Sequence, residues 1–251
     1  AMVLTRDEEV GGHGARVMAQ QWPSDRRLPT ATVIGEPTSM RVVRMHKGFL
    51  KMRLEIRGAS GHTGDPSVGR NAIAPVARAI ERLQRLRDDL LELRTETSRA
   101  FGSLPSPVLT IVGVRGGSAW NMTPDHCALD VGLRLLPDQD PREWLTRLED
   151  ELEAVLEGEE WSLELINETP SMLTGPDSTL HLAACRLLGQ DHDLGVSYGT
   201  DGAWLQRLGL ECIVVGPGDI SVAHQPDEYM PVDEYRAGRQ FMESIIAEFC
   251  S

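Results

Sequence analysis

Strict alternation of apolar and charged side chains runs through Leu50-Lys51-Met52-Arg53-Leu54-Glu55-Ile56-Arg57. Because successive side chains of a β-strand point to opposite faces, this pattern predicts a strand with one buried face and one face in water. The apolar face of such a strand needs a second layer to cover it. The neighbouring residues must therefore supply further strands and at least one covering helix.

Helical spacing follows this strand along the chain. Residues about 70–87 place Ile73, Val76 and Leu83 on one stripe, which predicts a helix with one apolar face. Two strands, a second amphipathic helix and a fourth strand are then predicted at 108–114, 129–135, 144–155 and 161–165. The order β-α-β-β-α-β is that of the ferredoxin-like unit. We therefore expect residues 44–170 to form an inserted α+β domain.

Short, continuously apolar runs flank this domain at Met2–Leu4, Ala31–Ile34 and Cys212–Val215. Such runs are typical of strands that are buried on both faces of a parallel sheet. Each run leads to a carboxylate or an imidazole, and ligands of open α/β sheets gather beyond the carboxyl ends of the strands. We therefore expect residues 1–43 and 171–251 to form one mostly parallel α/β catalytic domain with a convergent site.

The composition narrows the class of protein. Among 251 residues, 25 are Lys or Arg and 38 are Asp or Glu, so the formal net charge is −13. This charge disfavours nucleic acid and an anionic membrane as partners. No stretch approaches the roughly 18–20 apolar residues of a membrane span. The four cysteines are scattered without a CxxC pair, which favours a reducing, cytoplasmic location.

Several residues could carry chemistry, although each of them alone has an ordinary explanation. The triplet Asp7-Glu8-Glu9 could be an acidic helix start, which the helix dipole favours. Adjacent carboxylates can also divide labour, one binding a metal while its neighbour takes a proton from water. Glu36 and His62 could be plain turn residues and His224 a plain loop residue. Asp227 and Glu228 could orient His224.

Taken together, these residues belong to six longer stretches that resemble the M20-type family of metallopeptidases and deacylases. That family contains acetylornithine deacetylase, succinyl-diaminopimelate desuccinylase, aminoacylase and carboxypeptidase G. The stretches occur in the family's order and span nearly the whole chain. They are TRDEEVGGHGA (5–15), IGEPTS (34–39), HKGFLKMRLEIRGASGHTGDPSVGRNAI (46–73), GGSAWNMTPDHCALDVGLRLLP (116–137), YGTDGAWL (198–205) and VVGPGDISVAHQPDEYMPVDEY (214–235). The HKG and GPG…AHQPDEY segments resemble the acetylornithine deacetylase branch most.

The resemblance implies a metal centre. Glu8 would be the general base, and Glu9, Glu36 and His224 would be metal ligands. His224 would share one metal with Glu9, while Glu36 would serve the other. Zinc is the expected metal, with cobalt or another divalent ion as the alternative. It would polarise the amide carbonyl and activate the attacking water.

The resemblance also implies substrate contacts and a dimer. His62 would reach the active site of a partner subunit and stabilise the oxyanion. The inserted domain would be a lid and dimerisation domain, associating through the helix at 70–87 or through Leu50–Ile56 as an edge strand. The substrate contacts would be Asn121, Arg134, Gly199 and Thr200.

Part of the family pattern does not occur in these 251 residues. An early His-x-Asp motif and a bridging aspartate lie upstream of the acidic triplet in the family, whereas only six residues precede Asp7 here. Catalytic zinc usually has about three protein ligands. We therefore expect an N-terminally truncated chain with doubtful metal occupancy and weak activity.

The expected function is hydrolysis of the amide bond of an N-acyl amino acid, as in acetylornithine deacetylase. Desuccinylase, aminoacylase and dipeptidase are alternatives within the same family. The alternative from another class is a non-catalytic, metal-deficient binding or dimerisation protein, which metal analysis would distinguish.

Overall fold

The computed structural model describes residues 2–8, 11–65 and 67–250. The chain divides into two compact units. Unit 1 consists of Ala1–Gly48, Thr97–Pro105 and Thr169–Ser251, and unit 2 consists of Phe49–Glu96 and Ser106–Glu168. No helix in the described part of the chain is long and apolar enough to cross a membrane.

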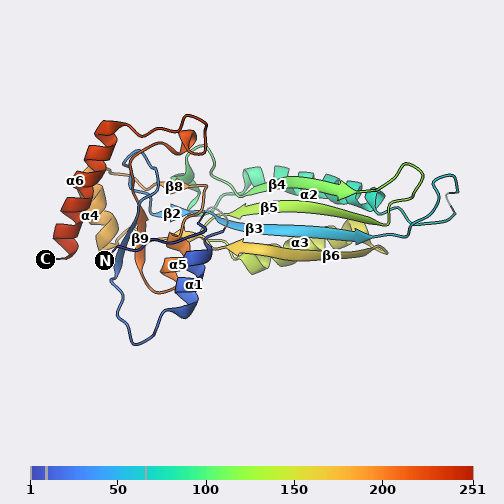
Figure 1. Ribbon diagram of the computed structural model, residues 1–251, viewed down its shortest axis with the longest axis horizontal. Coiled ribbons are helices and arrows are strands. Elements are labelled where there is room, and N and C mark those ends of the chain that lie inside the picture. Colours follow the sequence, from blue (N-terminus) through green and yellow to red (C-terminus); the bar gives the residue numbers. More distant parts are fainter. Residues whose placement is uncertain (1, 9–10, 66, 251) are drawn as a thin grey trace. The chain divides into compact units, whose positions relative to one another are not determined.

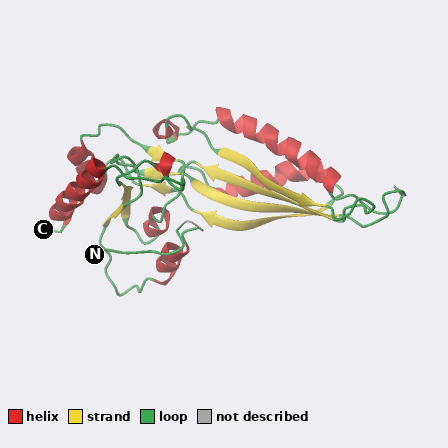
Figure 2. Cartoon of the chain, turned by 45° about the horizontal axis from the view of Figure 1, so that its top comes forward, coloured by secondary structure: helices red, strands yellow, loops and turns green. Residues whose placement is uncertain are grey.

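Unit 2 is a four-stranded sheet with two helices on one of its faces, as Figures 1 and 2 show from two directions. The strand order is β4-β5-β3-β6. The elements follow the chain as β3 (Gly48–Arg57), α2 (Ile73–Glu92), β4 (Val108–Gly116), β5 (His126–Leu135), α3 (Pro141–Leu156) and β6 (Glu160–Thr169). The ferredoxin-like α+β order predicted from the periodicities is therefore confirmed.

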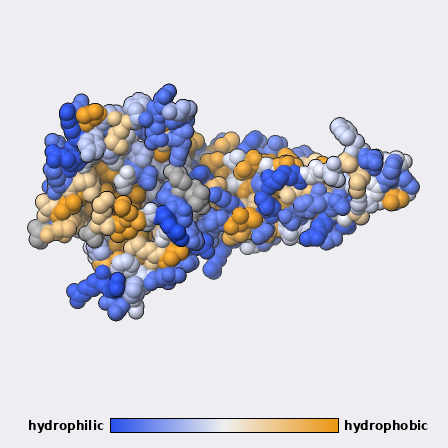
Figure 3. Space-filling model, in the orientation of Figure 1, coloured by the Kyte–Doolittle hydropathy of each residue, from blue (hydrophilic) through white to orange (hydrophobic). Residues whose placement is uncertain are grey.

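The alternation in β3 explains how this unit is held together. Leu50, Met52, Leu54 and Ile56 are all buried, and they pack against the apolar stripes of α2 and α3. Burying apolar surface at roughly 25 cal/mol per Å² is the main favourable contribution to folding. The opposite face stays open, and Figure 3 shows hydrophobic and hydrophilic residues interspersed on it.

One expectation about unit 2 is wrong. The strand containing Leu50–Ile56 is an inner strand, because β3 lies between β5 and β6. Alternating apolar and polar side chains indicate that one face of a strand is buried, but they do not indicate which strands lie on either side of it. The edges of this sheet are β4 and β6, so β3 cannot offer a free edge to another subunit.

Unit 1 contains a parallel pair, β1 (Ala31–Ile34) and β9 (Glu211–Val214). A second, three-stranded sheet has the order β7-β2-β8, formed by Met172–Leu173, Met45–His46 and Gly195–Val196. The helices are α1 (His13–Gln21), α4 (Thr179–Leu188), α5 (Gly202–Gln206) and α6 (Val232–Phe249), with short 3-10 turns at Ser98–Phe101 and Ile220–Val222.

The β1–β9 pair is covered on both faces, as its continuously apolar sequence predicts. Ile213 belongs to a core cluster with residues of α4 and α6, which lie side by side in Figure 1. Cys212 and Val214 belong to a cluster on the other face that includes Ala203 and Leu205 of α5. The carboxyl ends of both strands consequently point to the same edge.

The strand predicted at Met2–Leu4 is not present. These residues have no strand structure, and Met2 and Leu4 are each 84% exposed. An apolar run forms a strand only where a neighbouring strand offers it a ladder of hydrogen bonds. In the part of the chain that the structure describes, no strand pairs with these residues.

The core of unit 2 makes a stability prediction. Replacing Leu129 of β5, which is fully buried, by alanine leaves a cavity and should lower the free energy of unfolding by about 2–5 kcal/mol. Val112→Ala, at a side chain 68% exposed on β4, should cost less than about 1 kcal/mol. Urea denaturation of both variants measures the difference. Equal losses would contradict the assignment of this core.

Candidate active site

The loops that follow β1 and β9 are bound to each other. The amide of Thr38 donates to the carbonyl of Gly216 at 3.1 Å, and the amide of Gly216 donates to Oγ1 of Thr38 at 3.2 Å. A Cβ on Gly216 would lie only 2.4 Å from the carbonyl oxygen of Glu36. Only glycine lets the two backbones approach this closely, so Gly216 holds the loop of Glu36 against the loop that leads to His224.

A hollow of about 430 Å³ opens between these two loops. Gly35, Pro37, Pro217, Gly218, Asp219, Val222, Glu228, Tyr229 and Met230 line it. Glu36 is half-buried beside it, and His224 lies in the same loop as its far wall. Parallel pairing of β1 with β9 therefore places the loop of Glu36 against Gly216, in the loop that leads to His224.

His224 has an unusual backbone conformation. Its φ of 61° lies in the left-handed region, which a non-glycine residue seldom adopts. The Oε2 atom of Glu228 accepts a hydrogen bond from the amide of His224 at 3.0 Å and so holds the turn. The nearby carboxylate thus orients His224 through its backbone.

Tyr198 is hydrogen-bonded to the loop that carries Glu36. Its hydroxyl donates to the carbonyl of Pro37 at 3.2 Å. Burial raises the pKa of Tyr198, and the carboxylate of Glu36 raises it further. The phenol is consequently neutral and acts as a hydrogen-bond donor at physiological pH.

Asp7 and Glu8 of the acidic triplet lie in a tight turn. The amides of Gly11 and Gly12 each donate to the carbonyl of Glu8 at 3.0 Å, and Asp7 has a left-handed φ of 58°. The residue Glu8 is half-buried. Glu9, the predicted ligand beside it, lies outside the described residues, so its placement is not part of the structure.

The described residues do not complete a metal centre by themselves. Among residues 2–8, 11–65 and 67–250, no group of three His, Cys, Asp or Glu side chains could hold a metal ion. Glu36 and His224 are suitable ligand types, but catalytic zinc usually needs about three protein ligands. The described donor set therefore does not fit a complete zinc site.

Gly199 and Thr200, the predicted pocket residues of unit 1, lie in a buried turn next to His46. The amide of Thr200 donates to Nε2 of His46 at 3.2 Å, while Nδ1 of His46 lies 3.0 Å from the carbonyl of Lys47. These partners assign the ring proton to Nδ1. The sequence did not single out His46, because burial of an isolated histidine has no periodic signal.

At one end of the unit 2 sheet, two loops carry His62 and Asn121. A β-bridge joins His62 to Met122, and the amide of Thr63 donates to the carbonyl of Asn121 at 3.1 Å. The amide of Gly64 donates to Nδ1 of His62 at 3.1 Å, so the neutral ring carries its proton on Nε2. Both His62 and Asn121 are exposed.

Arg134 lies at the other end of the same sheet. Eight residue steps along β5 separate it from His126, which corresponds to roughly 27 Å in an extended strand. Its guanidinium stacks over the ring of Phe49 at 4.4 Å, and burial lowers the pKa of Arg134. Within one chain, unit 2 thus keeps Arg134 apart from Asn121 and His62.

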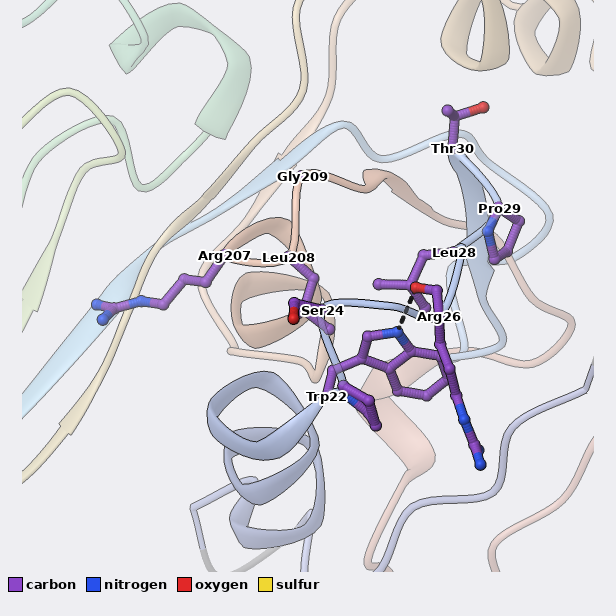
Figure 4. Close-up of a pocket in the computed structure, with 10 residues that line it drawn as sticks. Trp22, Ser24, Arg26, Leu28, Pro29, Thr30, Arg207, Leu208 and Gly209 are labelled. Carbon is purple, nitrogen blue, oxygen red and sulfur yellow. Dashed lines mark hydrogen bonds between the residues drawn. The ribbon is translucent and has the colours of Figure 1, made fainter.

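A second hollow lies at the start of β1 and has a different chemical character. Its volume is about 520 Å³, and its lining includes Trp22, Arg26 and Arg207. Figure 4 shows the indole of Trp22 donating to the carbonyl of Arg26, at 3.1 Å. Among the residues that the structure describes, no carboxylate or imidazole lines this hollow, so it does not match the predicted site.

Gly216 makes a testable prediction. Gly216→Ala should destabilise the protein by about 1–3 kcal/mol, because the new methyl group meets the backbone of Glu36. Gly35→Ala is the matched control in the facing loop, since a Cβ there meets nothing within 4 Å. Thermal denaturation measures both changes. A neutral Gly216→Ala variant would show that the two loops are not closely packed.

Comparison with known proteins agrees with this arrangement. Residues 44–160 match the family model of the M20 peptidase dimerisation domain. The acetylornithine deacetylase of Klebsiella pneumoniae is 35% identical over 252 residues, which cover 99% of this chain and 64% of that protein. The chain therefore spans less than two thirds of the length of this curated relative.

Solved structures of low sequence identity share the fold. Aminopeptidase PepT of Bacillus cereus matches with a TM-score of 0.74 and 18% identity, covering 98% of this chain and 63% of its own. The YXEP protein of Bacillus subtilis, described as a dinuclear metal binding peptidase, matches with a TM-score of 0.68 and 15% identity, covering 95% of this chain and 62% of its own. Residues 44–160 thus match the dimerisation domain of the M20 peptidases, and the chain as a whole is similar to members of that family.

Proposed function

We propose that this chain carries the larger part of a divalent-metal hydrolase that cleaves the amide bond of N-acyl amino acids, with N-acetylornithine as its first candidate substrate. The observation that carries the proposal is the close packing of the β1 and β9 loops, which bear Glu36 and His224. The 35% identity to an acetylornithine deacetylase supports the substrate class. Succinyl-diaminopimelate, other N-acyl amino acids and dipeptides are the alternative substrates.

The chain's own residues have distinct proposed roles. Glu8, half-buried in its turn, takes a proton from the attacking water and returns it to the leaving amine. His62 carries an exposed Nε2–H, which suits it to donate to the developing oxyanion. In the proposal, Gly199 and Thr200 contact the substrate. Arg134 is suited to bind the substrate carboxylate, because a planar guanidinium matches two carboxylate oxygens.

The metal ligands in the proposal are Glu9, Glu36 and His224, with zinc, cobalt or another divalent ion as the metal. The described residues alone form no three-ligand group, so further donors are needed for a complete centre. This shortage favours one second candidate function, a metal-deficient binding or dimerisation protein. Metal content and turnover distinguish the two functions.

We further propose that the protein works as a homodimer. A small amino-acid substrate cannot span the length of β5, so Arg134 and the pair His62 and Asn121 cannot contact one substrate from the same chain. A two-fold dimer solves this problem, since the exposed loops of one subunit can complete the site of the other. Helix α2 or an edge strand of the sheet, β4 or β6, would supply the contact.

The state of the cysteines supports a proposal about the cellular compartment of the protein. Cys127, Cys185, Cys212 and Cys250 are all free thiols. Free buried thiols such as Cys212, whose pKa is raised to about 12 by burial, persist in a reducing compartment. We therefore propose the cytoplasm.

The role of Glu8 can be tested by Glu8→Gln. The assay uses a chimera in which the segment that the family pattern places upstream of the acidic triplet, taken from the Klebsiella pneumoniae relative, precedes residue 2 and supplies further metal donors. Turnover of N-acetylornithine should fall by about 10²–10⁴-fold with metal content unchanged, since a base is lost rather than a ligand. Asp7→Asn, at the exposed neighbouring carboxylate, is the control and should retain activity. Undiminished turnover in Glu8→Gln would refute the assignment.

The dimer can be tested by mixing two inactive variants of the same chimera. Glu8→Gln chains still supply His62, and His62→Ala chains still supply Glu8. After subunit exchange, about half the dimers are mixed and each has one intact site, so about a quarter of the wild-type activity should return. A mixture that stays inactive, while sedimentation shows mixed dimers, would mean that His62 serves its own chain.

A further inference from the structure

A buried carboxylate that the proposed chemistry does not use lies directly after the Gly199–Thr200 turn. Asp201 is only 7% exposed. Its Oδ2 atom accepts a hydrogen bond from Oγ1 of Thr5, which is 196 residues away in the sequence. Its Oδ1 atom is fully buried and has no hydrogen-bond partner among the described residues. Asp201 therefore joins two distant segments of unit 1.

This carboxylate is costly to keep in such a place. Burial raises the pKa of Asp201, and the hydrogen bond from Thr5 only partly opposes that effect. Desolvation of a charged group without full hydrogen bonding destabilises the folded state. The five residues of α5 that follow form too short a helix to compensate it through a dipole. A carboxylate retained at this cost is a candidate for a functional role.

A second contact joins the same two segments. Gly12 has a left-handed φ of 66°, and a Cβ at this position would lie 3.2 Å from Oδ1 of Asp201 and 3.1 Å from Nε1 of Trp204. The indole nitrogen of Trp204 is also buried without a partner among the described residues. Thr5 and Gly12, which lie on either side of Glu8 in the sequence, are thus both next to Asp201.

The turn between these two residues is closed by its own backbone. The amide of Gly12 donates to the carbonyl of Asp7 at 3.1 Å, and the amide of Gly14 donates to the carbonyl of Arg6 at 3.1 Å. These bonds hold residues 11–14 against residues 6–8. The position of this segment relative to the Gly199–Thr200 turn is consequently linked to Asp201, which lies beside Thr5 and Gly12.

We propose that Asp201 is a positioning residue, which ties the Thr5–Gly12 turn to the Gly199–Thr200 turn and thereby fixes where Glu8 stands. The part of this inference that concerns catalysis rests on the proposed function of Glu8. The tether itself does not depend on that function. The two parts can therefore be tested separately.

The tether is tested in the present chain by amide hydrogen exchange of residues 11–14, whose amides hydrogen-bond to the carbonyls of residues 6–8. Thr5→Val removes the donor and Asp201→Ala removes the acceptor. Each should raise exchange at these amides about tenfold or more, as expected for losing a hydrogen bond to a charged group. Thr5→Ser keeps the hydroxyl and should restore exchange to the level of the unmodified chain.

The matched control is Thr174→Val. The hydroxyl of Thr174 is buried in unit 1 and donates to the carbonyl of Cys212, but it touches neither turn. Its loss should lower overall stability and leave exchange at residues 11–14 unchanged. Because Thr5 is exposed, Thr5→Val remains informative even if Asp201→Ala fails to fold. Unchanged exchange in Thr5→Val, or an equal rise in Thr174→Val, would overturn the tether.

Turnover of N-acetylornithine by the chimera tests the catalytic part. Thr5→Val should lower kcat about tenfold with little change in KM, and Thr5→Ser should restore it. If Thr5→Val raises hydrogen exchange at residues 11–14 but leaves kcat unchanged, the tether does not position Glu8 for catalysis. If even the unmodified chimera hydrolyses no N-acyl amino acid, the proposed function fails, whereas the exchange measurement still decides whether the tether exists.

Discussion

The parallel ladder between β1 and β9 is the interaction on which the rest of the candidate site depends. Ala31 pairs with Glu211 and Ile34 with Val214, so both strands end at the same level. The residues that follow are therefore delivered to one edge, one loop carrying Glu36 and the other carrying His224. Gly216 then permits contact between the two backbones. A shift of this register would move the loop of Glu36 away from the loop of His224, even with the sequence of both loops unchanged.

Electrostatic cost sets a second constraint on unit 1. Carboxylates occur at Glu8, Glu36 and Asp201, and Asp201 is buried with one oxygen unpaired among the described residues. Such groups lower stability unless a cation or hydrogen bonds compensate them. In the proposed function, a divalent cation beyond the end of the β1–β9 pair would balance the charge of Glu36. Asp201 is retained, in our proposal, for its tether to Thr5. The two proposals together account for carboxylates that would otherwise only weaken the fold.

Local periodicity allowed much of the fold to be predicted. The alternation in β3 and the stripes of α2 and α3 reflect contacts within one unit, and their order determines the ferredoxin-like architecture. The parallel pair β1–β9 was also predictable, because strands covered on both faces are apolar throughout. The order of the strands within each sheet was not predictable in the same way. The inner position of β3, and the absence of a strand at Met2–Leu4, depend on which partner strands are present.

The site was predictable only as a set of motifs. In the sequence, Glu36 and His224 follow apolar runs that end in Gly or Pro, and Glu8 belongs to an acidic triplet. Asp201 and His46 have no such sequence signal, because their importance depends on burial and on partners that are distant in the sequence. The placement of Asn121 and Arg134 at opposite ends of one sheet likewise follows from strand direction and not from residue type.

Whether Glu36 and His224 share one site can be measured most directly by titrating the chimera with Co²⁺ and recording its visible absorption spectrum. The account predicts a bound-cobalt spectrum that Glu36→Gln and His224→Asn each weaken or alter. A spectrum and affinity that neither substitution changes would contradict it.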